Sequence, residues 1–245
     1  MADINGLWIF GYGSLCWNPG FEFNRSITGF IKGFERKFWQ GNATHRGTTE
    51  KPGRVVTLVE NKQEITYGRA FEVKGDAALP YLNNRECKLG GYLTTITTFY
   101  SRDKKLSFPV VIYIATNDNE HWLGDAPLKD IAEQIFTSKG PSGHNVEYLL
   151  RLANFMHRCI PEANDDHLFT LETLVRAKIK SNNLCLHTLM GHREFTIELE
   201  SSDLEIGESN DDDDDNNINR NNEAPANSFQ YTSRIPVKTL RCLKP

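Results

Sequence analysis

The segment best suited to chemistry is a glycine turn that directly follows a short apolar run at residues 7–10. The turn consists of Gly11, Tyr12, Gly13, Ser14 and Leu15. Glycine lets the backbone turn sharply, so that successive N–H groups can point into one concave spot that binds anions. The same residues could form a plain β-turn, but they are not the dinucleotide fingerprint, because no GxGxxG pattern opens a helix here. We therefore treat the glycine turn, together with Cys16, as a candidate substrate cradle.

A second candidate is Glu86, which lies between a predicted short helix and a predicted strand. A carboxylate can take a proton from a substrate and later return it, although a Glu beside an Arg, here Arg85, is more often a solvated surface pair. Cys87 follows directly, with no histidine near it in the sequence. We expect a half-buried thiol there rather than a nucleophile.

Other polar residues are weaker candidates for a site. Ser142, Asn145 and Tyr148 could be polar groups near the floor of a substrate pocket, or simply turn and cap residues; Asn145 is well placed to cap a helix. His157 and His167 could suggest a metal site, but we favour two solvated histidines and predict no metal. Arg46 offers a cation, although an arginine in a loop is most often solvated.

The elements that must position these residues change in character along the chain. In the first half, apolar and alternating segments predict strands; they cover residues 7–10, 54–59, 67–73, 92–100 and 108–115. Gly68 marks a bulge or a close backbone approach. Many strands and little helix before residue 120 favour a sheet that curls into a small mixed or antiparallel barrel.

The second half has helical periodicity. Pro127 is predicted as the first residue of a helix that Asp125 caps and that ends at Gly140. A second helix is predicted over residues 145–159, and Pro161 is predicted to start a third that runs to about residue 175. The fold class is therefore α+β, with helices packed on the barrel.

The C-terminal part is predicted as an extension, residues 181–245, of a domain that covers residues 1–180. Residues 201–227 are low in complexity and nearly free of apolar side chains, which predicts disorder. The flanking residues 185–199 and 229–243 could pair as two strands.

Composition limits the function further. The net charge is −4, and residues 203–223 hold nine acids and one base, a local sum of −8, so the remainder carries about +4. This dispersed surplus of positive charge suits small anionic substrates, but it is too small to indicate a nucleic-acid-binding protein. The five cysteines lack a CxxC pair, and the N-terminus has no signal-peptide pattern or span-length apolar run. We expect a cytoplasmic protein without a membrane or nucleic-acid partner.

Taken in series, the motifs closely resemble those of the ChaC family of γ-glutamylcyclotransferases across roughly residues 7–176. The matching segments are Trp8-Ile9-Phe10-Gly11-Tyr12-Gly13-Ser14-Leu15, Phe38-Trp39-Gln40-Gly41, Thr44-His45-Arg46-Gly47, Pro52-Gly53-Arg54, Asn84-Arg85-Glu86, Gly90-Gly91-Tyr92, Leu123-Gly124, Ala132-Glu133-Gln134-Ile135 and Gly140-Pro141-Ser142-Gly143-His144-Asn145-Val146-Glu147-Tyr148-Leu149. These segments fall into five regions, residues 8–15, 38–54, 84–92, 123–135 and 140–149, whose order and spacing are far more specific than any one of them. The chain departs from the family at its C-terminus, which is longer by about 70 residues and includes the acidic run.

The resemblance implies the family's small barrel with flanking helices and its reaction, the splitting of glutathione into 5-oxoproline and cysteinylglycine. It implies Glu86 as the catalytic acid/base and the segment that begins at Gly11 as the substrate cradle, with no cofactor. Two alternatives stay open. One is a cyclotransferase for other γ-glutamyl peptides or amines, and the other is a binding or regulatory module without turnover.

Overall fold

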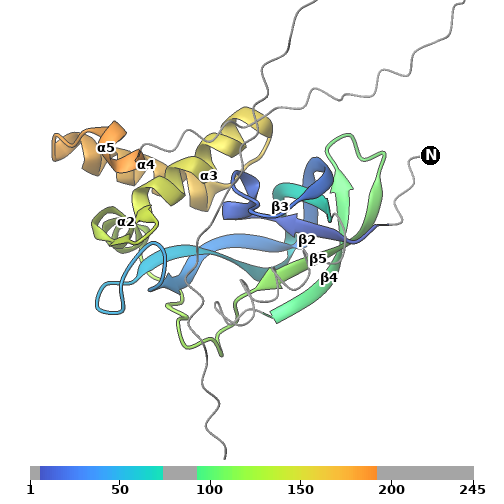
Figure 1. Ribbon diagram of the computed structural model, residues 1–245, viewed down its shortest axis with the longest axis horizontal. Helices are drawn as coiled ribbons and strands as arrows, with labels where there is room; N and C mark the ends of the chain where they lie inside the picture. Colours follow the sequence, from blue (N-terminus) through green and yellow to red (C-terminus); the bar gives the residue numbers. More distant parts are fainter. Residues whose placement is uncertain (1–5, 74–92, 192–245) are drawn as a thin grey trace, which may run out of the picture. The chain divides into compact units, whose positions relative to one another are not determined.

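The structure, a computed structural model, describes residues 6–73 and 93–191. Their strands form a closed barrel in the order β1-β3-β2-β4-β5 (Figure 1). The strands are β1 (Trp8–Gly11), β2 (Phe23–Asn42), β3 (Gly53–Val73), β4 (Leu93–Ser101) and β5 (Ser107–Ile114). Neighbouring strands are antiparallel except β1 and β5, which pair in parallel through Ile9 and Val111. The predicted small barrel is confirmed, and of the two alternatives it is mixed, because β1 and β5 are parallel.

The long hairpin of β2 and β3 differs from the prediction. Residues 54–59 and 67–73 belong to one strand, and β2 was not predicted at all. The pairing shifts register at three places, the largest where residues 61–64 of β3 oppose Gly33 of β2. These irregularities interrupt the alternation of buried side chains along both strands, which is the sequence signal for a strand.

Four described helices follow the barrel, namely α2 (Leu128–Thr137), α3 (Asn145–Cys159), α4 (Asp166–Ser181) and α5 (Leu186–Met190). A two-stranded ribbon of β6 (Lys139–Gly140) and β7 (Gly143–His144) joins α2 to α3. The bounds of α3 match the prediction. None of the described helices is long and apolar enough to cross a membrane.

Three features of the helices differ from the prediction. They are the first residues of α2 and α4 and the helical conformation of α5. Pro127 precedes the first helical residue of α2 instead of occupying it, and Asp125 accepts the N–H of Ala126, which lies before the helix. The third helix does not start at Pro161, because Asp165 caps α4 by accepting the N–H of Leu168 at 3.0 Å. The helix α5 lies where part of a strand was predicted, and the remaining residues of that predicted strand pair lie outside the described residues.

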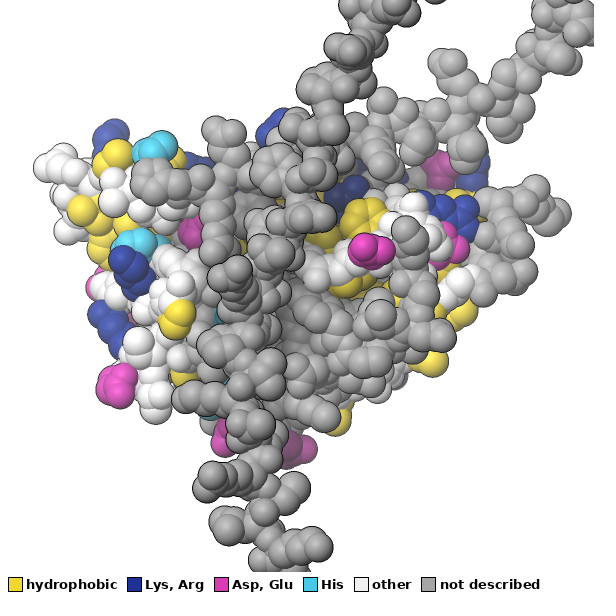
Figure 2. Space-filling view, in the orientation of Figure 1, with side chains coloured by type: hydrophobic (Ala, Val, Ile, Leu, Met, Phe, Trp, Pro, Cys, Tyr) yellow, Lys and Arg dark blue, Asp and Glu magenta, His cyan; other side chains and the backbone are white. Residues whose placement is uncertain are grey.

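The core joins the barrel to the helices. Helix α3 packs against β3, η1 (Ser14–Cys16) and the other three helices, and one buried cluster runs from Phe10 and Phe99 in the barrel to Leu149 and Phe155 of α3. The close approach predicted at Gly68 is confirmed, since a Cβ there would collide with the carbonyl oxygen of Gly11. On the face in Figure 2, acidic and basic side chains are interspersed over the described surface.

Candidate functional site

A pocket opens beside the end of β1, where residues from distant parts of the chain meet. Its described lining comes from β1, the glycine turn, β3, β5 and α3. The lining residues are Phe10, Tyr12, Gly13, Ser14, Leu15, Val56, Tyr113 and Tyr148. The structure thus brings four members of the glycine turn and Tyr148, which are over 130 residues apart in the sequence, to one place. The described lining is aromatic and hydroxylic, and none of its side chains carries a charge.

The predicted turn follows β1 directly. After β1 ends at Gly11, the chain enters the 3₁₀ turn η1, in which the N–H of Cys16 bonds the carbonyl of Gly13 at 3.0 Å. The first N–H groups of a helical turn have no partner within that turn, so they are suited to an anion. A Cβ on Gly13 would lie 2.8 Å from both the Tyr148 hydroxyl and a Val56 methyl. Glycine is therefore required for the turn to sit this close to α3.

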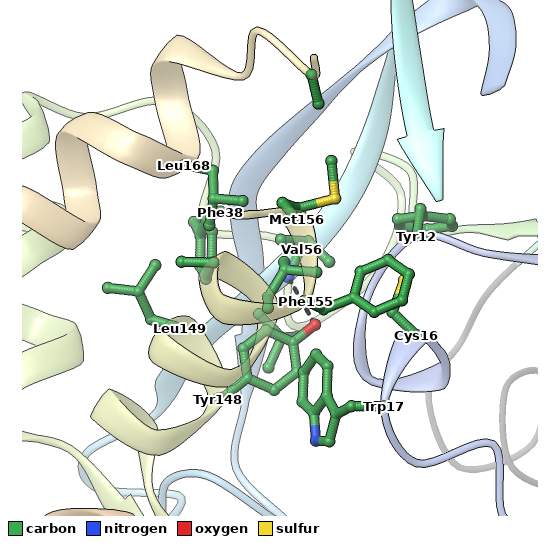
Figure 3. Packing of buried hydrophobic residues seen from close by; sticks show 14 of the residues in the cluster. Tyr12, Cys16, Trp17, Phe38, Val56, Tyr148, Leu149, Phe155, Met156 and Leu168 are labelled. Atoms are coloured by element: carbon green, nitrogen blue, oxygen red, sulfur yellow. Dashed lines mark hydrogen bonds between the residues drawn. The ribbon is translucent and has the colours of Figure 1, made fainter. Parts of the chain in front are cut away.

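Tyr148 and Tyr12 present hydroxyl groups at this pocket. The Tyr148 hydroxyl accepts the N–H of Val56 at 3.3 Å, and its ring packs edge-on against Trp17 and Phe38 (Figure 3). The Tyr12 hydroxyl donates to the carbonyl of Tyr113. Sequence reasoning missed Val56 and Tyr113, which look like ordinary strand residues.

Cys16 is not among the residues that line the pocket. Its thiol is fully buried and donates to the carbonyl of Gly11 at 3.2 Å. Burial raises the pKa of this thiol to about 12, against a smaller opposing effect of Arg36. Cys16 is therefore a neutral thiol that stabilises the turn through its hydrogen bond to Gly11.

Asn145 and Ser142 lie elsewhere. The Asn145 side chain accepts the backbone N–H of Arg54 at 2.6 Å and donates to the Arg54 carbonyl at 2.8 Å. The predicted cap is wrong, because His144 is the N-cap residue and Asn145 is already helical. Ser142 is half-buried, and its N–H donates to the carbonyl of His45 at 2.9 Å. Neither residue lines the pocket, so both stay predictions as substrate contacts.

Replacing Asn145 with alanine should lower the free energy of unfolding by about 2–4 kcal/mol, because two buried backbone groups of Arg54 lose their partners. Urea unfolding would measure this, with Asn182→Ala on the exposed end of α4 as the control. A loss below about 0.5 kcal/mol in Asn145→Ala would contradict the assignment of this side chain as a clamp between α3 and β3.

Two arginines that sequence reasoning left as loop or strand residues are covered by the fold: Arg54 is buried and Arg46 is half-buried. Arg46 is not solvated, since its guanidinium is 2.5 Å from the Glu147 carboxylate and also donates to the carbonyl of His144. Arg54 donates to the side chain of Gln134 and to the carbonyls of Phe38 and Gly124. Burial lowers the pKa of Arg54. Arg46 therefore links the loop after β2 to α3, and Arg54 links β3 to α2 and β2.

The two histidines differ from each other. His157 is half-exposed and lies 2.8 Å from Glu172. His167 is not a solvated histidine, because its Nε2 accepts the N–H of Phe38 at 3.0 Å and its ring stacks on that of Phe38. Desolvation, with a smaller contribution from Lys37, lowers the pKa of His167 to about 4.

This lowered pKa predicts a stability that depends on pH. The unfolded chain binds a proton on this imidazole near pH 6.5, whereas the folded chain binds it only near pH 4. The contribution of His167 to the free energy of unfolding is therefore fully present above pH 6.5 and is lost as the pH falls from 6.5 toward 4. The free energy of unfolding should drop by about 1–2 kcal/mol between pH 7 and pH 5 from this group. In His167→Gln, which still offers an acceptor but cannot be protonated, the drop should shrink by that amount. His157→Gln is the control, and an unchanged pH dependence in His167→Gln would contradict the assignment.

Glu86, Arg85 and Cys87 lie outside the described residues. The same holds for the predicted segment 201–227. The role of Glu86 therefore stays a prediction.

Comparison with known proteins adds independent findings. A family model described as ChaC-like protein matches residues 7–178. The zebrafish (Danio rerio) protein named glutathione-specific γ-glutamylcyclotransferase 1 is 50% identical over 184 residues, which cover 74% of this chain and 94% of that protein. The human protein of the same name is 51% identical over 171 residues, covering 68% and 77%. A crystal structure of a yeast γ-glutamyl cyclotransferase specific to glutathione superposes with a TM-score of 0.64 at 26% identity, covering 70% of this chain and 96% of the yeast chain.

Proposed function

The chain belongs to the ChaC-like family, and we infer from this that it is a glutathione-specific γ-glutamylcyclotransferase. It cleaves glutathione into 5-oxoproline and cysteinylglycine. The observation that carries this conclusion is the 50% identity to a relative that bears this name, over 94% of that relative's length. The matched region includes the glycine turn and Tyr148, which line one pocket.

The reaction needs a substrate whose γ-glutamyl chain is held folded back on itself, and one group that carries a proton. The α-amine of the γ-glutamyl group attacks the γ-carbonyl carbon, a five-membered ring closes, and the bond to the cysteine nitrogen breaks. Both reacting groups belong to the same molecule, so holding them in a near-attack geometry supplies much of the rate. The atoms balance without an oxidant, a metal or another cofactor.

The proton carrier is proposed to be Glu86. The α-ammonium must lose a proton before its nitrogen can attack, and the leaving nitrogen must gain one. A single carboxylate can serve as base and then as acid. Since the described lining of the pocket offers no carboxylate or imidazole, this group must come from another part of the chain. The motif Asn84-Arg85-Glu86 supports Glu86.

The glycine turn is proposed to hold the α-carboxylate of the γ-glutamyl group. The supporting observation is that Tyr12, Gly13, Ser14 and Leu15 of this turn line the pocket. Backbone donors can bind a carboxylate where no charged side chain is at hand. With the carboxylate fixed there, the amine is free to turn toward the γ-carbonyl.

An assay of the purified protein tests this function. Glutathione should give cysteinylglycine, whereas γ-glutamyl-alanine and γ-glutamyl-ε-lysine should be turned over at least ~10-fold more slowly, because a site that bonds polar groups of its substrate rejects analogues that lack them. Faster turnover of either analogue would contradict specificity for glutathione. Binding of glutathione without turnover would favour a regulatory module instead.

The cytoplasm is the compartment that we propose. The cysteines at positions 16, 159 and 185 all carry free thiols, which a reducing compartment preserves. Imaging a tagged full-length chain in cells would test this.

A further inference from the structure

The pocket lies past the end of the strand that separates β3 from β5. In the barrel order β1 lies between these two strands, and it ends at Gly11. Strands β1 and β5 run parallel and Ile9 pairs with Val111, so Ala115 lies past the level of Gly11. At that level the chain has turned away from the sheet into η1. Something other than the ladder of β1 therefore joins β3 to β5 beside the pocket.

The side chain of Thr57 makes this connection. Its hydroxyl donates to the carbonyl of Ala115 at 2.9 Å and accepts the N–H of Ala115 at 3.1 Å. Thr57 is 0% exposed and Ala115 is 1% exposed, so water does not compete for these two bonds. A buried hydroxyl that bonds both backbone groups of one residue fixes β3 against the end of β5 in a single position.

This pair of bonds lies directly beside two residues of the pocket wall. Val56 precedes Thr57 in β3, and Tyr113 lies two residues before the bonded alanine. Both Val56 and Tyr113 line the pocket. The end of β5 is also held by the chain after β1, because the Tyr12 hydroxyl donates to the Tyr113 carbonyl. Side-chain hydrogen bonds to the backbone of residues 113 and 115 therefore fix the wall that Val56 and Tyr113 form.

Val56 depends on its neighbour because the ladder with β2 does not hold it. The pairing of β2 with β3 shifts register around Val56, which lies in a bulge with no ladder partner in β2. Its N–H donates instead to the Tyr148 hydroxyl at 3.3 Å (Figure 3). One of its methyl groups would lie 2.8 Å from a Cβ on Gly13. Bulges re-aim groups beside active sites, and a shift of Thr57 would move Val56 against both α3 and the glycine turn.

We propose that Thr57 is a positioning residue for the cyclisation, and this assignment rests on the proposed function. Its hydroxyl holds the wall of Val56 and Tyr113, so that a γ-glutamyl group bound by the glycine turn folds back with its amine near the γ-carbonyl. Thr57 is not among the described residues that line the pocket, so it acts through Val56. A displacement of about 1 Å in such a wall can cost 10²-fold in rate.

The first test compares Thr57→Val with Thr66→Val on glutathione. Valine has nearly the shape of threonine but lacks the hydroxyl. Thr66 is the matched control on the same strand, because it is 3% exposed and its hydroxyl donates to the carbonyl of Phe34 at 2.8 Å, away from the pocket lining. Both variants lose a buried hydrogen bond and should unfold at a lower temperature than wild type.

Kinetics at a temperature where both variants are folded should tell them apart. We expect kcat to fall roughly 10- to 100-fold in Thr57→Val and less than about 2-fold in Thr66→Val, because only the first change moves the pocket wall. KM should change less than about 3-fold in either variant, since the glycine turn still holds the carboxylate.

Thr57→Ser tests whether the hydroxyl or the packing of the side chain matters. Serine restores the hydroxyl without the methyl group, so kcat should return to within about 3-fold of wild type. A side chain that mattered only through packing would not be rescued in this way, because serine fills less space than valine.

Thr57→Cys keeps the comparison informative if Thr57→Val does not fold. Its thiol occupies the place of the serine hydroxyl but is only a weak donor and acceptor. We expect kcat of Thr57→Cys to be roughly 3- to 10-fold below that of Thr57→Ser, because the weaker bond holds the wall less firmly. The control pair Thr66→Cys and Thr66→Ser should have equal kcat. Equal kcat in Thr57→Cys and Thr57→Ser would overturn the proposal.

The remaining outcomes separate this assignment from the proposed function. If wild type releases cysteinylglycine but Thr57→Val keeps its kcat or changes only in KM, the assignment is wrong. It is equally wrong if Thr66→Val loses as much kcat, or if Thr57→Ser is as slow as Thr57→Val. If wild type releases no cysteinylglycine, the proposed function fails, and the assignment of Thr57 fails with it.

Discussion

Replacing Glu86 with glutamine should lower kcat for glutathione by at least ~100-fold, the range that a general acid/base supplies. Glutamine keeps the size and hydrogen-bonding capacity of the side chain but cannot carry the proton from the ammonium to the leaving nitrogen. Binding of the substrate should change much less, because the glycine turn provides the proposed contacts to the carboxylate. Initial rates of cysteinylglycine release, measured over a range of glutathione concentrations, give both constants.

The matched control is Glu64→Gln, which makes the same change on an exposed residue of β3. It should retain the wild-type kcat. If Glu86→Gln also turned over glutathione at the wild-type rate, Glu86 would not be the proton carrier. The search would then move to other carboxylates outside the described lining of the pocket.

Replacing Gly13 with alanine should lower kcat/KM by at least ~100-fold. The added methyl would lie 2.8 Å from the Tyr148 hydroxyl and 2.8 Å from a Val56 methyl, so either the turn or α3 must shift. A displacement of about 1 Å in a positioning element can cost 10²-fold in rate. Steady-state kinetics on glutathione, with thermal unfolding of the same sample, would measure this effect and separate it from loss of fold.

Gly33→Ala is the control, because it strains the backbone without placing a methyl group in the pocket. Gly33 has φ +86° and no atom within 4 Å of an added Cβ, so alanine there costs about 1–2 kcal/mol of stability and leaves the pocket untouched. It should keep the wild-type kcat/KM at a temperature where it is folded. A wild-type kcat/KM in Gly13→Ala would show that the glycine turn does not form a wall of the substrate site.

The features that could be predicted from the sequence are those that local patterns determine. The apolar face of residues 145–159 and the glycine-rich ribbon before it define α3 to the residue. Strands with regular alternation, such as β4 and β5, lie within a residue of their predicted bounds. Local rules failed for β2, because its register shifts disrupt the alternation, and at Pro161, because Asp165 supplies a better helix cap further along.

In the candidate site, too, local sequence patterns predicted some residues and missed those that depend on long-range contacts. The residue types of the glycine turn suggested it as a candidate, and Tyr148 was a weaker candidate within the last motif of the family resemblance, but Val56 and Tyr113 join the pocket only because the barrel closes around β1. Asn145 was read as a local cap, whereas its partner Arg54 lies 91 residues earlier in the chain. His167 and Arg46 were read as solvated because nothing local indicates that Phe38 and Glu147 will cover them.

The most direct test of cyclisation is to identify the products that purified wild-type protein forms from glutathione. Mass spectrometry and amino-acid analysis of the same reaction should find 5-oxoproline and cysteinylglycine in equal amounts, with no free glutamate. Equal amounts are expected because the α-amine of the substrate is itself the nucleophile. Free glutamate in place of 5-oxoproline would mean that water attacks the γ-carbonyl, and it would contradict the cyclotransferase mechanism.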